Sequence, residues 1–175
     1  MLGAYSMIRV LVSSCLLGEA VRYHGGDAHC PSSILDRWRA EGRLVPACPE
    51  TAAGLPVPRP PAEIAGGDGA TVLQGQACVG DSTGADVTAA FLQGARTALE
   101  VAVANGVRLA ILKDGSPSCA TSYIYDGAFR GQRTPGQGVT AALLSQAGIR
   151  LFSERQLEEA AAYLEALEAE LPPGP

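Results

Sequence analysis

The sequence predicts an α/β fold in three layers, in which a mostly parallel, twisted, Rossmann-like sheet lies between helices on both faces. Two observations predict it. Short runs of β-branched and aliphatic residues recur along the chain, and segments with apolar residues at helical spacing separate them. Strands that alternate with helices favour a parallel sheet, because each connection between parallel strands has to cross over the sheet.

The length and composition of the chain fit one domain. The chain has 175 residues, of which 47% are hydrophobic and 18% charged. It is therefore long enough to bury a core and too apolar to be disordered. We expect an N-terminal extension at 1–6, because Met7 can begin the domain by itself, then a single α/β domain at 7–171 and a short tail at 172–175.

The first part of the domain contains two expected strands with a helix between them. The β-branched run "IRVLVSS" at 8–14 predicts a buried strand. Ser32 or Ser33 can cap a helix that runs to about Glu41. The run "RLVPAC" at 43–48 predicts the second strand.

The middle of the chain lacks a clear periodic pattern. Residues 49–70 are rich in Pro and Gly, so we expect a long loop there without a regular element. After this loop, "TVLQ" at 71–74 and "QACVGDS" at 76–82 are expected to pair as a short hairpin.

The second part of the domain contains the clearest helix, which Asp86 caps and which ends at Asn105 and Gly106. Its apolar residues recur at helical spacing. The remaining elements follow from the same patterns. They are a strand at 107–113, a helix within 134–148, a strand at 149–153, and a last helix that Ser153 and Gln156 cap.

The charge and hydropathy of the chain exclude several classes of partner. The net charge is −5 and no basic run is present, so we expect no duplex nucleic acid. No apolar segment reaches the roughly 20 residues of a membrane span, and no signal peptide is recognisable. We therefore expect a cytoplasmic protein with no membrane partner. The Ala-rich face of residues 158–169 is a candidate homodimer contact.

Three of the five cysteines follow predicted strands. Cys15 ends the first strand, Cys48 ends the second, and Cys119 comes shortly after the strand at 107–113, in the loop "DGSPSC". Ligands of open α/β sheets bind at the carboxyl ends of the strands. If these strands are neighbours, the three sulfur atoms converge at that edge.

Three convergent thiolates allow more than one interpretation. A structural zinc ion takes four ligands, and the candidates for the fourth are His24, His29 and Cys30. An iron–sulfur cluster is normally held by four cysteines, and with three of them one iron is free to bind a substrate atom. The spacing also fits buried, inert thiols in a reducing compartment. The residues alone leave these alternatives open.

The segments around the cysteines carry a family resemblance. The motifs "SSCLLGEAVRYHGG", "VPACPETAAGLPVPRPPAEI", "DVTAAFLQGA", "LAILKDGSPSCATSYIYDGAF" and "PGQGVTAALL", in this order, resemble the thiouracil desulfidase family from Met7 to about Leu157. The resemblance implies a [4Fe–4S] cluster that Cys15, Cys48 and Cys119 hold, with one open iron. It also implies a bacterial enzyme that converts thiouracil to uracil and hydrosulfide without net redox change. The substrate sulfur would bind the open iron while water attacks the thiolated carbon.

The resemblance also implies roles for residues outside the cysteine set. Glu50 would move protons to and from the water and the base, while Ser116 and Ser118 would orient the substrate or the water. The expected partner is a small thiolated nucleobase or nucleoside, and the candidate substrate-binding residues are Arg22, Tyr23 and Arg59. The plainer alternatives are a Glu50–Arg59 ion pair, serine hydrogen bonds within the turn, and arginines that fix the long loop.

The sequence departs from the family pattern at Val21, His24, Ala53 and Ala120, and His24 is the departure expected to affect substrate choice. Two other functions stay open at this point. One is a metal- or ligand-binding module without turnover, and the other is a metal-free hydrolase with a single activated cysteine. The two remaining cysteines, Cys30 and Cys78, are expected to be structural.

Overall fold

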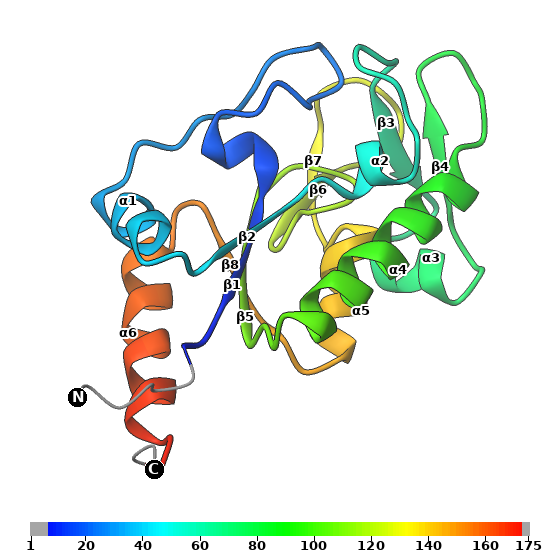
Figure 1. Cartoon of the computed structure of the whole chain (residues 1–175). Helices are drawn as coiled ribbons and strands as arrows, with labels where there is room; N and C mark the ends of the chain where they lie inside the picture. Colours follow the sequence, from blue (N-terminus) through cyan, green and yellow to red (C-terminus); the bar gives the residue numbers. More distant parts are fainter. Residues whose placement is uncertain (1–6, 173–175) are drawn as a thin grey trace.

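A parallel sheet of four strands forms the centre of the computed structural model, which describes residues 7–172 (Figure 1). The expected extension at 1–6 lies outside the described residues, as does the expected tail apart from Pro172. The two inner strands are buried along their whole length, as a parallel sheet covered on both faces requires. The strand order is β2 (Leu44–Ala47), β1 (Val10–Ser13), β5 (Leu109–Leu112) and β8 (Arg150–Ser153).

Helices cover both faces of this sheet, so the predicted three-layer α/β fold is confirmed. Figure 1 shows helices on each side of the sheet. One side has α1 (Ser33–Ala40) and α6 (Leu157–Ala169), and the other has α4 (Thr88–Ala104) and α5 (Val139–Gln146). Ser32 caps α1 as expected, because its Oγ accepts the amide of Ile34 at 3.2 Å.

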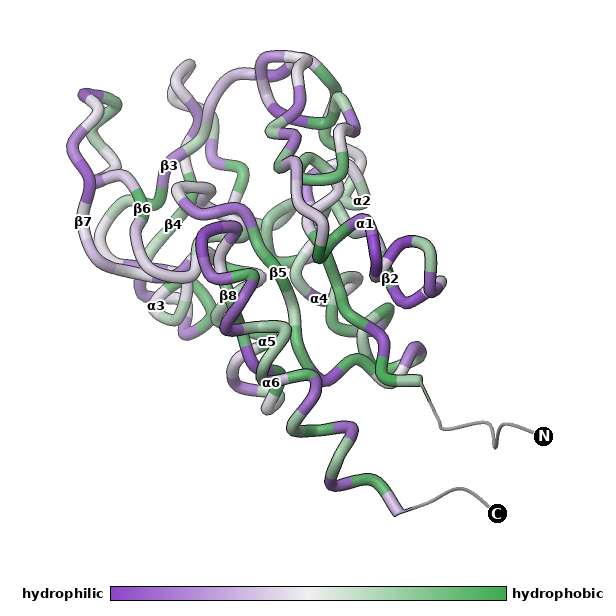
Figure 2. Tube along the Cα trace, turned by 90° about the vertical axis from the view of Figure 1, so that its left-hand side faces the viewer, coloured by the Kyte–Doolittle hydropathy of each residue, from purple (hydrophilic) through white to green (hydrophobic). Residues whose placement is uncertain are grey.

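The central sheet separates two buried clusters of the core. Successive residues of a strand point to opposite faces. Val10 and Val12 of β1 therefore join the cluster that contains Trp38 of α1, whereas Leu11 joins the cluster that contains Leu144 of α5. Figure 2 shows the hydrophobic colour of β5 running through the middle of the molecule.

The expectation of an irregular loop at 49–70 followed by a hairpin at 71–82 is wrong. The segment contains the short helix α2 (Pro49–Ala52) and the strand β3 (Ala62–Ala65). Residues Gly69–Leu73 form helix α3, and the antiparallel partner of β3 is β4 (Cys78–Asp81). The physical reason for α3 is a capping box, in which Asp68 accepts the amide of Thr71 at 3.1 Å.

An antiparallel hairpin, which the sequence patterns did not predict, follows the loop of Cys119. It pairs β6 (Tyr123–Tyr125) with β7 (Arg133–Pro135). A third buried cluster contains Ile124 of β6 together with Ile64 of β3 and Phe91 of α4, so both two-stranded sheets are anchored to the helical layer. Within the described part of the chain, none of the helices has the length and apolar character needed to cross a membrane.

Candidate active site

A cavity of about 600 Å³ opens at the carboxyl end of the parallel sheet. This volume is within the usual range of small-molecule sites. Its lining residues come from the segments that follow β1, β2 and β5, and from the two-stranded sheets β3–β4 and β6–β7 with their connections. The topology explains this position, because β2, β1 and β5 are neighbours and parallel, so the segments that leave them meet at one edge.

The structure brings the three strand-end cysteines to this one cavity. Cys15 lies in the short 3₁₀ helix η1 (Ser14–Leu17) directly after β1. Cys48 is the residue before α2, directly after β2. Cys119 lies in the loop after β5, and all three residues line the cavity.

The thiols are close enough to influence one another. Burial raises the pKa of Cys15 to about 11. The nearby Arg22 cation acts to lower this pKa, and Cys48 acts to raise it. Burial also raises the pKa of Cys119 to about 12. A hydrogen bond with Ser13 acts to lower this pKa, whereas the nearby Cys15 and Cys48 act to raise it. Grouped buried thiols of this kind lose their protons readily only when a cation compensates the charge.

The donor set fits an iron–sulfur cluster chemically, because three soft sulfur donors from separate segments line one cavity. Across residues 7–172, no group of three or more His, Cys, Asp or Glu side chains is placed to hold a single metal ion. A single ion draws its sulfur ligands to about 2.3 Å from one point. In a cluster, each thiolate binds its own iron, so the ligands stand farther apart.

Glu50 lines the same cavity and forms an ion pair with Arg59. Arg59 Nε donates to Glu50 Oε2 at 2.7 Å, and both side chains are largely buried, with 6% of Arg59 and 15% of Glu50 exposed. The other nitrogens of Arg59 donate to the carbonyl oxygens of Pro56 at 3.1 Å and Val21 at 3.0 Å. Oε1 of Glu50 receives no hydrogen bond from residues 7–172. Arg59 therefore fixes Glu50 and the neighbouring loops while one carboxylate oxygen stays available.

The two serines of the Cys119 loop differ in their surroundings. The Oγ of Ser116 accepts the amides of Ser118 and Cys119, each at 3.1 Å, so it shapes the turn that presents Cys119. Its own hydroxyl hydrogen remains free to be donated, because the oxygen acts only as an acceptor in these bonds. The hydroxyl of Ser118 is buried and lies 2.9 Å from Thr140 Oγ1 on α5. This geometry favours a structural role for Ser118.

Arg22 and Tyr23 also line the cavity. The guanidinium carbon of Arg22 lies 5.9 Å from the centre of the Tyr23 ring, within the range of a cation–π contact. No hydrogen bond or ion pair within residues 7–172 engages the Arg22 guanidinium. Arg22 is therefore a cation beside Cys15 whose donors are available to a ligand.

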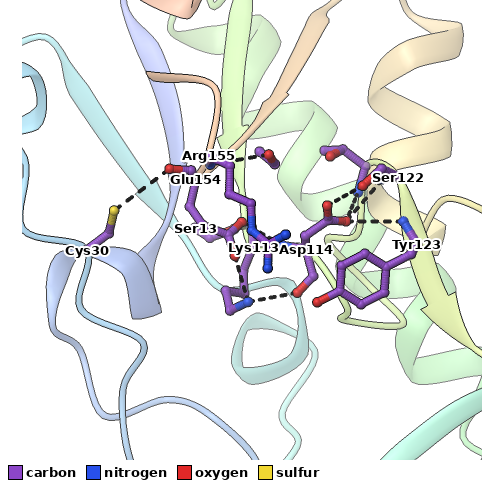
Figure 3. Close-up of polar contacts among 10 residues, drawn as sticks. Ser13, Cys30, Lys113, Asp114, Ser122, Tyr123, Glu154 and Arg155 are labelled. Carbon is purple, nitrogen blue, oxygen red and sulfur yellow. Dashed lines mark hydrogen bonds and ion pairs between the residues drawn. The ribbon is translucent and has the colours of Figure 1, made fainter. Parts of the chain in front are cut away.

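A buried aspartate, which sequence reasoning missed, organises the loop that carries Cys119. Asp114 Oδ1 accepts the amides of Thr121, Ser122 and Tyr123 at 3.1, 3.0 and 3.3 Å, and the Ser122 hydroxyl donates to Oδ2 (Figure 3). Burial acts to raise the pKa of Asp114, but the hydrogen bonds from Ser122 and the amides outweigh it and hold the pKa below its usual value. The sequence signal that could have indicated this role is the pair Asp114-Gly115, because an Asp before a Gly just after a strand is typical of a turn.

Asp114 belongs to a polar network that joins three segments at the cavity wall, which Ser13, Lys113 and Asp114 line. Lys113 Nζ donates to Glu154 Oε1 at 2.7 Å, and the amide of Asp114 donates to Glu154 Oε2 at 2.9 Å (Figure 3). The amide of Lys113 donates to Ser13 Oγ at 3.1 Å. The network thereby fixes the ends of β1, β5 and β8 relative to one another.

The remaining polar candidates lie away from the cavity lining. Cys30 Sγ faces the carbonyl of Glu154 at 4.0 Å, and Cys78 is exposed on β4. His24 is exposed, and its Nδ1 accepts the amide of Gly26 at 3.0 Å.

The other positions that depart from the family pattern are apolar. Val21 lines the cavity, Ala120 is fully buried and Ala53 ends α2.

The comparisons with known proteins agree with one another. The family model described as 2-thiouracil desulfurase matches residues 10–156. YbbK, an uncharacterized protein of Bacillus subtilis (strain 168), is 45% identical over 150 residues, which cover 86% of this chain and 98% of YbbK. A solved structure of the [4Fe–4S]-dependent thiouracil desulfidase TudS is 46% identical, superimposes with a TM-score of 0.83, and matches over 91% of this chain and 99% of its own. The chain therefore belongs to the 2-thiouracil desulfurase family.

Proposed function

We propose that this protein is a [4Fe–4S]-dependent desulfidase that converts thiolated pyrimidines such as thiouracil to the corresponding oxygen compound and hydrosulfide, without net redox change. One observation carries the proposal: three thiols, a carboxylate and a hydroxyl line a single cavity at the carboxyl end of the sheet. Family membership and the likeness to TudS support the same activity and the same cofactor.

In this proposal Cys15, Cys48 and Cys119 hold the cluster. When bound, a cluster with three protein ligands supplies an iron that acts as a Lewis acid and draws electron density from the C–S bond. The charge of three thiolates is then compensated inside a buried site, which accounts for their grouping.

Glu50 is the proposed proton-transfer group. Its Oε1 receives no hydrogen bond from the described residues, and Arg59 holds the other oxygen. As water attacks the thiolated carbon, Glu50 takes one proton from it. The C–S bond breaks, the carbon keeps the oxygen of the water as a carbonyl, and Glu50 passes the proton that it took to the departing sulfur, which leaves as hydrosulfide. The second proton of the water goes to solvent, so atoms and charge balance with no external oxidant or reductant.

Ser116 and Arg22 are the proposed orienting groups. Two amides fix the Ser116 oxygen, so its hydroxyl hydrogen is directed away from them and is available to the substrate or the water. The free cation of Arg22 lies near Cys15 and favours negative charge that develops on the departing sulfur. Tyr23 and Arg59 also line the cavity. Arg59 acts through its ion pair with Glu50 rather than on the substrate.

The test is hydrosulfide release from 2-thiouracil by the anaerobically reconstituted protein. We expect release by the native chain and a loss of about 100-fold or more in Glu50→Gln, with the visible spectrum of the cluster unchanged. Glu19→Gln, which alters an exposed carboxylate outside the cavity, is the matched control. A native protein that carries the cluster and releases no hydrosulfide contradicts the proposal and favours a binding module without turnover.

A further inference from the structure

Phe129 has a backbone conformation that its side chain disfavours. Its φ is 54°, and it is the single non-glycine residue with positive φ among residues 7–172. This left-handed region places Cβ too close to the following carbonyl oxygen, so residues other than Gly, Asn and Asp rarely occupy it. A bulky residue is held there only when its surroundings determine the conformation.

The loop between β6 and β7 supplies those surroundings. The amide of Phe129 donates to Glu63 Oε2 of β3 at 3.0 Å. Asp126 accepts the amide of Ala128 at 3.0 Å and pairs with Arg130 at 2.7 Å. At Gly127 an added Cβ would lie 2.6 Å from the carbonyl oxygen of Ile64, so the loop also packs tightly on β3. These contacts fix the backbone of Phe129 from both sides.

The strained conformation does not bury the aromatic ring. Phe129 is 40% exposed, and it lines the cavity that contains the three cysteines. Tyr23, which is also 40% exposed, lines the same cavity from the loop after β1. Burial of the ring in a core would account for the conformation, but this ring faces the site. The contacts of the loop hold the strained backbone, and the conformation that they hold places an exposed aromatic ring at the cavity.

We propose that Phe129 is a substrate-binding residue whose ring stacks on the planar face of the pyrimidine. The inference rests on the proposed function and deepens it, because stacking selects flat, aromatic heterocycles among compounds with the same polar edge. Base–aromatic stacking is an established source of affinity for nucleobases in proteins. Three polar residues of the cavity would then form hydrogen bonds with the polar edge of the pyrimidine: Glu50, Ser116 and Arg22.

The test compares Phe129→Trp, Phe129→Leu and Phe129→Gly in the cluster-loaded protein. For 2-thiouracil we expect KM to rise about tenfold in the Gly and Leu variants with kcat little changed, and near-native values in Phe129→Trp. Binding of uracil and of 5,6-dihydrouracil, which has the same polar edge but a puckered ring, gives a second measurement. The native protein should prefer uracil, and Phe129→Gly should lose that preference.

Thermal stability distinguishes a binding role from a structural one. Glycine accepts the positive φ, so Phe129→Gly should melt at the native temperature or above it. Val103→Ala, an exposed apolar residue on α4 outside the cavity, is the control for general effects. An unchanged KM and an unchanged uracil preference in Phe129→Gly overturn the inference while leaving the proposed function intact. A native protein that releases no hydrosulfide overturns both.

Discussion

Arg59 Nε lies 2.7 Å from Glu50 Oε2, and the same guanidinium also donates to the carbonyl oxygen of Val21. One buried cation therefore links the helix after Cys48 to the loop after Cys15. The orientation of the proposed proton-transfer group and the shape of one cavity wall depend on this single side chain.

The first prediction concerns this ion pair. Arg59→Met leaves the Glu50 carboxylate without its buried partner, so we expect a loss of about 3 kcal/mol in the free energy of unfolding, measured by urea denaturation. Hydrosulfide release should fall as well, because Glu50 is no longer held. Arg39→Ala is the control. It removes an exposed pair with Asp36 at 3.8 Å, and its effect on stability should be close to zero. Equal losses in the two variants would contradict this role for Arg59.

The two serines of the Cys119 loop should separate catalysis from stability. Ser116→Ala removes the available hydroxyl hydrogen and the acceptor of two amides in the turn, so we expect hydrosulfide release to fall about 100-fold along with a loss of stability. Ser118→Ala removes only the buried bond to Thr140, so we expect a loss of about 1 kcal/mol in the free energy of unfolding and near-native turnover. Single-turnover assays and urea denaturation measure the two effects, and a catalytic loss in Ser118→Ala would restore a direct role for that serine.

Asp114 should be a major support of the loop that carries Cys119. Asp114→Ala leaves three amides of the loop without their acceptor, so we expect a loss of about 3 kcal/mol in the free energy of unfolding. The same variant should bind less iron on reconstitution. Asp126→Ala is a comparison in the loop between β6 and β7, where the carboxylate accepts a single backbone amide, that of Ala128, so the loss should be smaller. Full iron content with native stability in Asp114→Ala would contradict the assignment.

The pH dependence of stability should reflect the same carboxylate. The folded pKa of Asp114 is below its usual value, so the charged form is favoured in the native state. Its contribution is complete above the unfolded pKa, about 3.9, and is lost as pH falls from there through the folded pKa. As the pH falls below about 4, the free energy of unfolding of the cluster-free chain should therefore decrease less steeply in Asp114→Asn than in the native chain. Parallel slopes would exclude this contribution.

The sequence predicted the fold class and the placement of the three cysteines because both depend on local patterns. The strands that precede Cys15, Cys48 and Cys119 are short aliphatic runs, and parallel strands bring their carboxyl ends to one edge. The pairing of β3 with β4 escaped prediction, because neither four-residue strand has a strong pattern and the helix α3 separates them.

The missed site residues share a dependence on distant partners. Glu154 contacts Lys113 from 41 positions away, and Glu63 contacts Phe129 from 66 positions away, so no spacing along the chain could indicate either contact. The positive φ of Phe129 follows from the contacts of its loop and has no residue signal, since phenylalanine does not favour that conformation. Family resemblance indicated Glu50 and Ser116 as candidates, but only the structure distinguishes the half-buried Ser116 from Ser118, whose hydroxyl is buried against Thr140.

Anaerobic iron and sulfide analysis of single Cys→Ser variants tests the central claim most directly. We predict about four iron and four sulfide per native chain, with a marked loss when Cys15, Cys48 or Cys119 is replaced. The same replacement at Cys30 or Cys78, which lie outside the cavity lining, should leave the iron content unchanged. Full iron content in a variant of Cys15, Cys48 or Cys119, or a native chain that takes up no iron, would contradict the account.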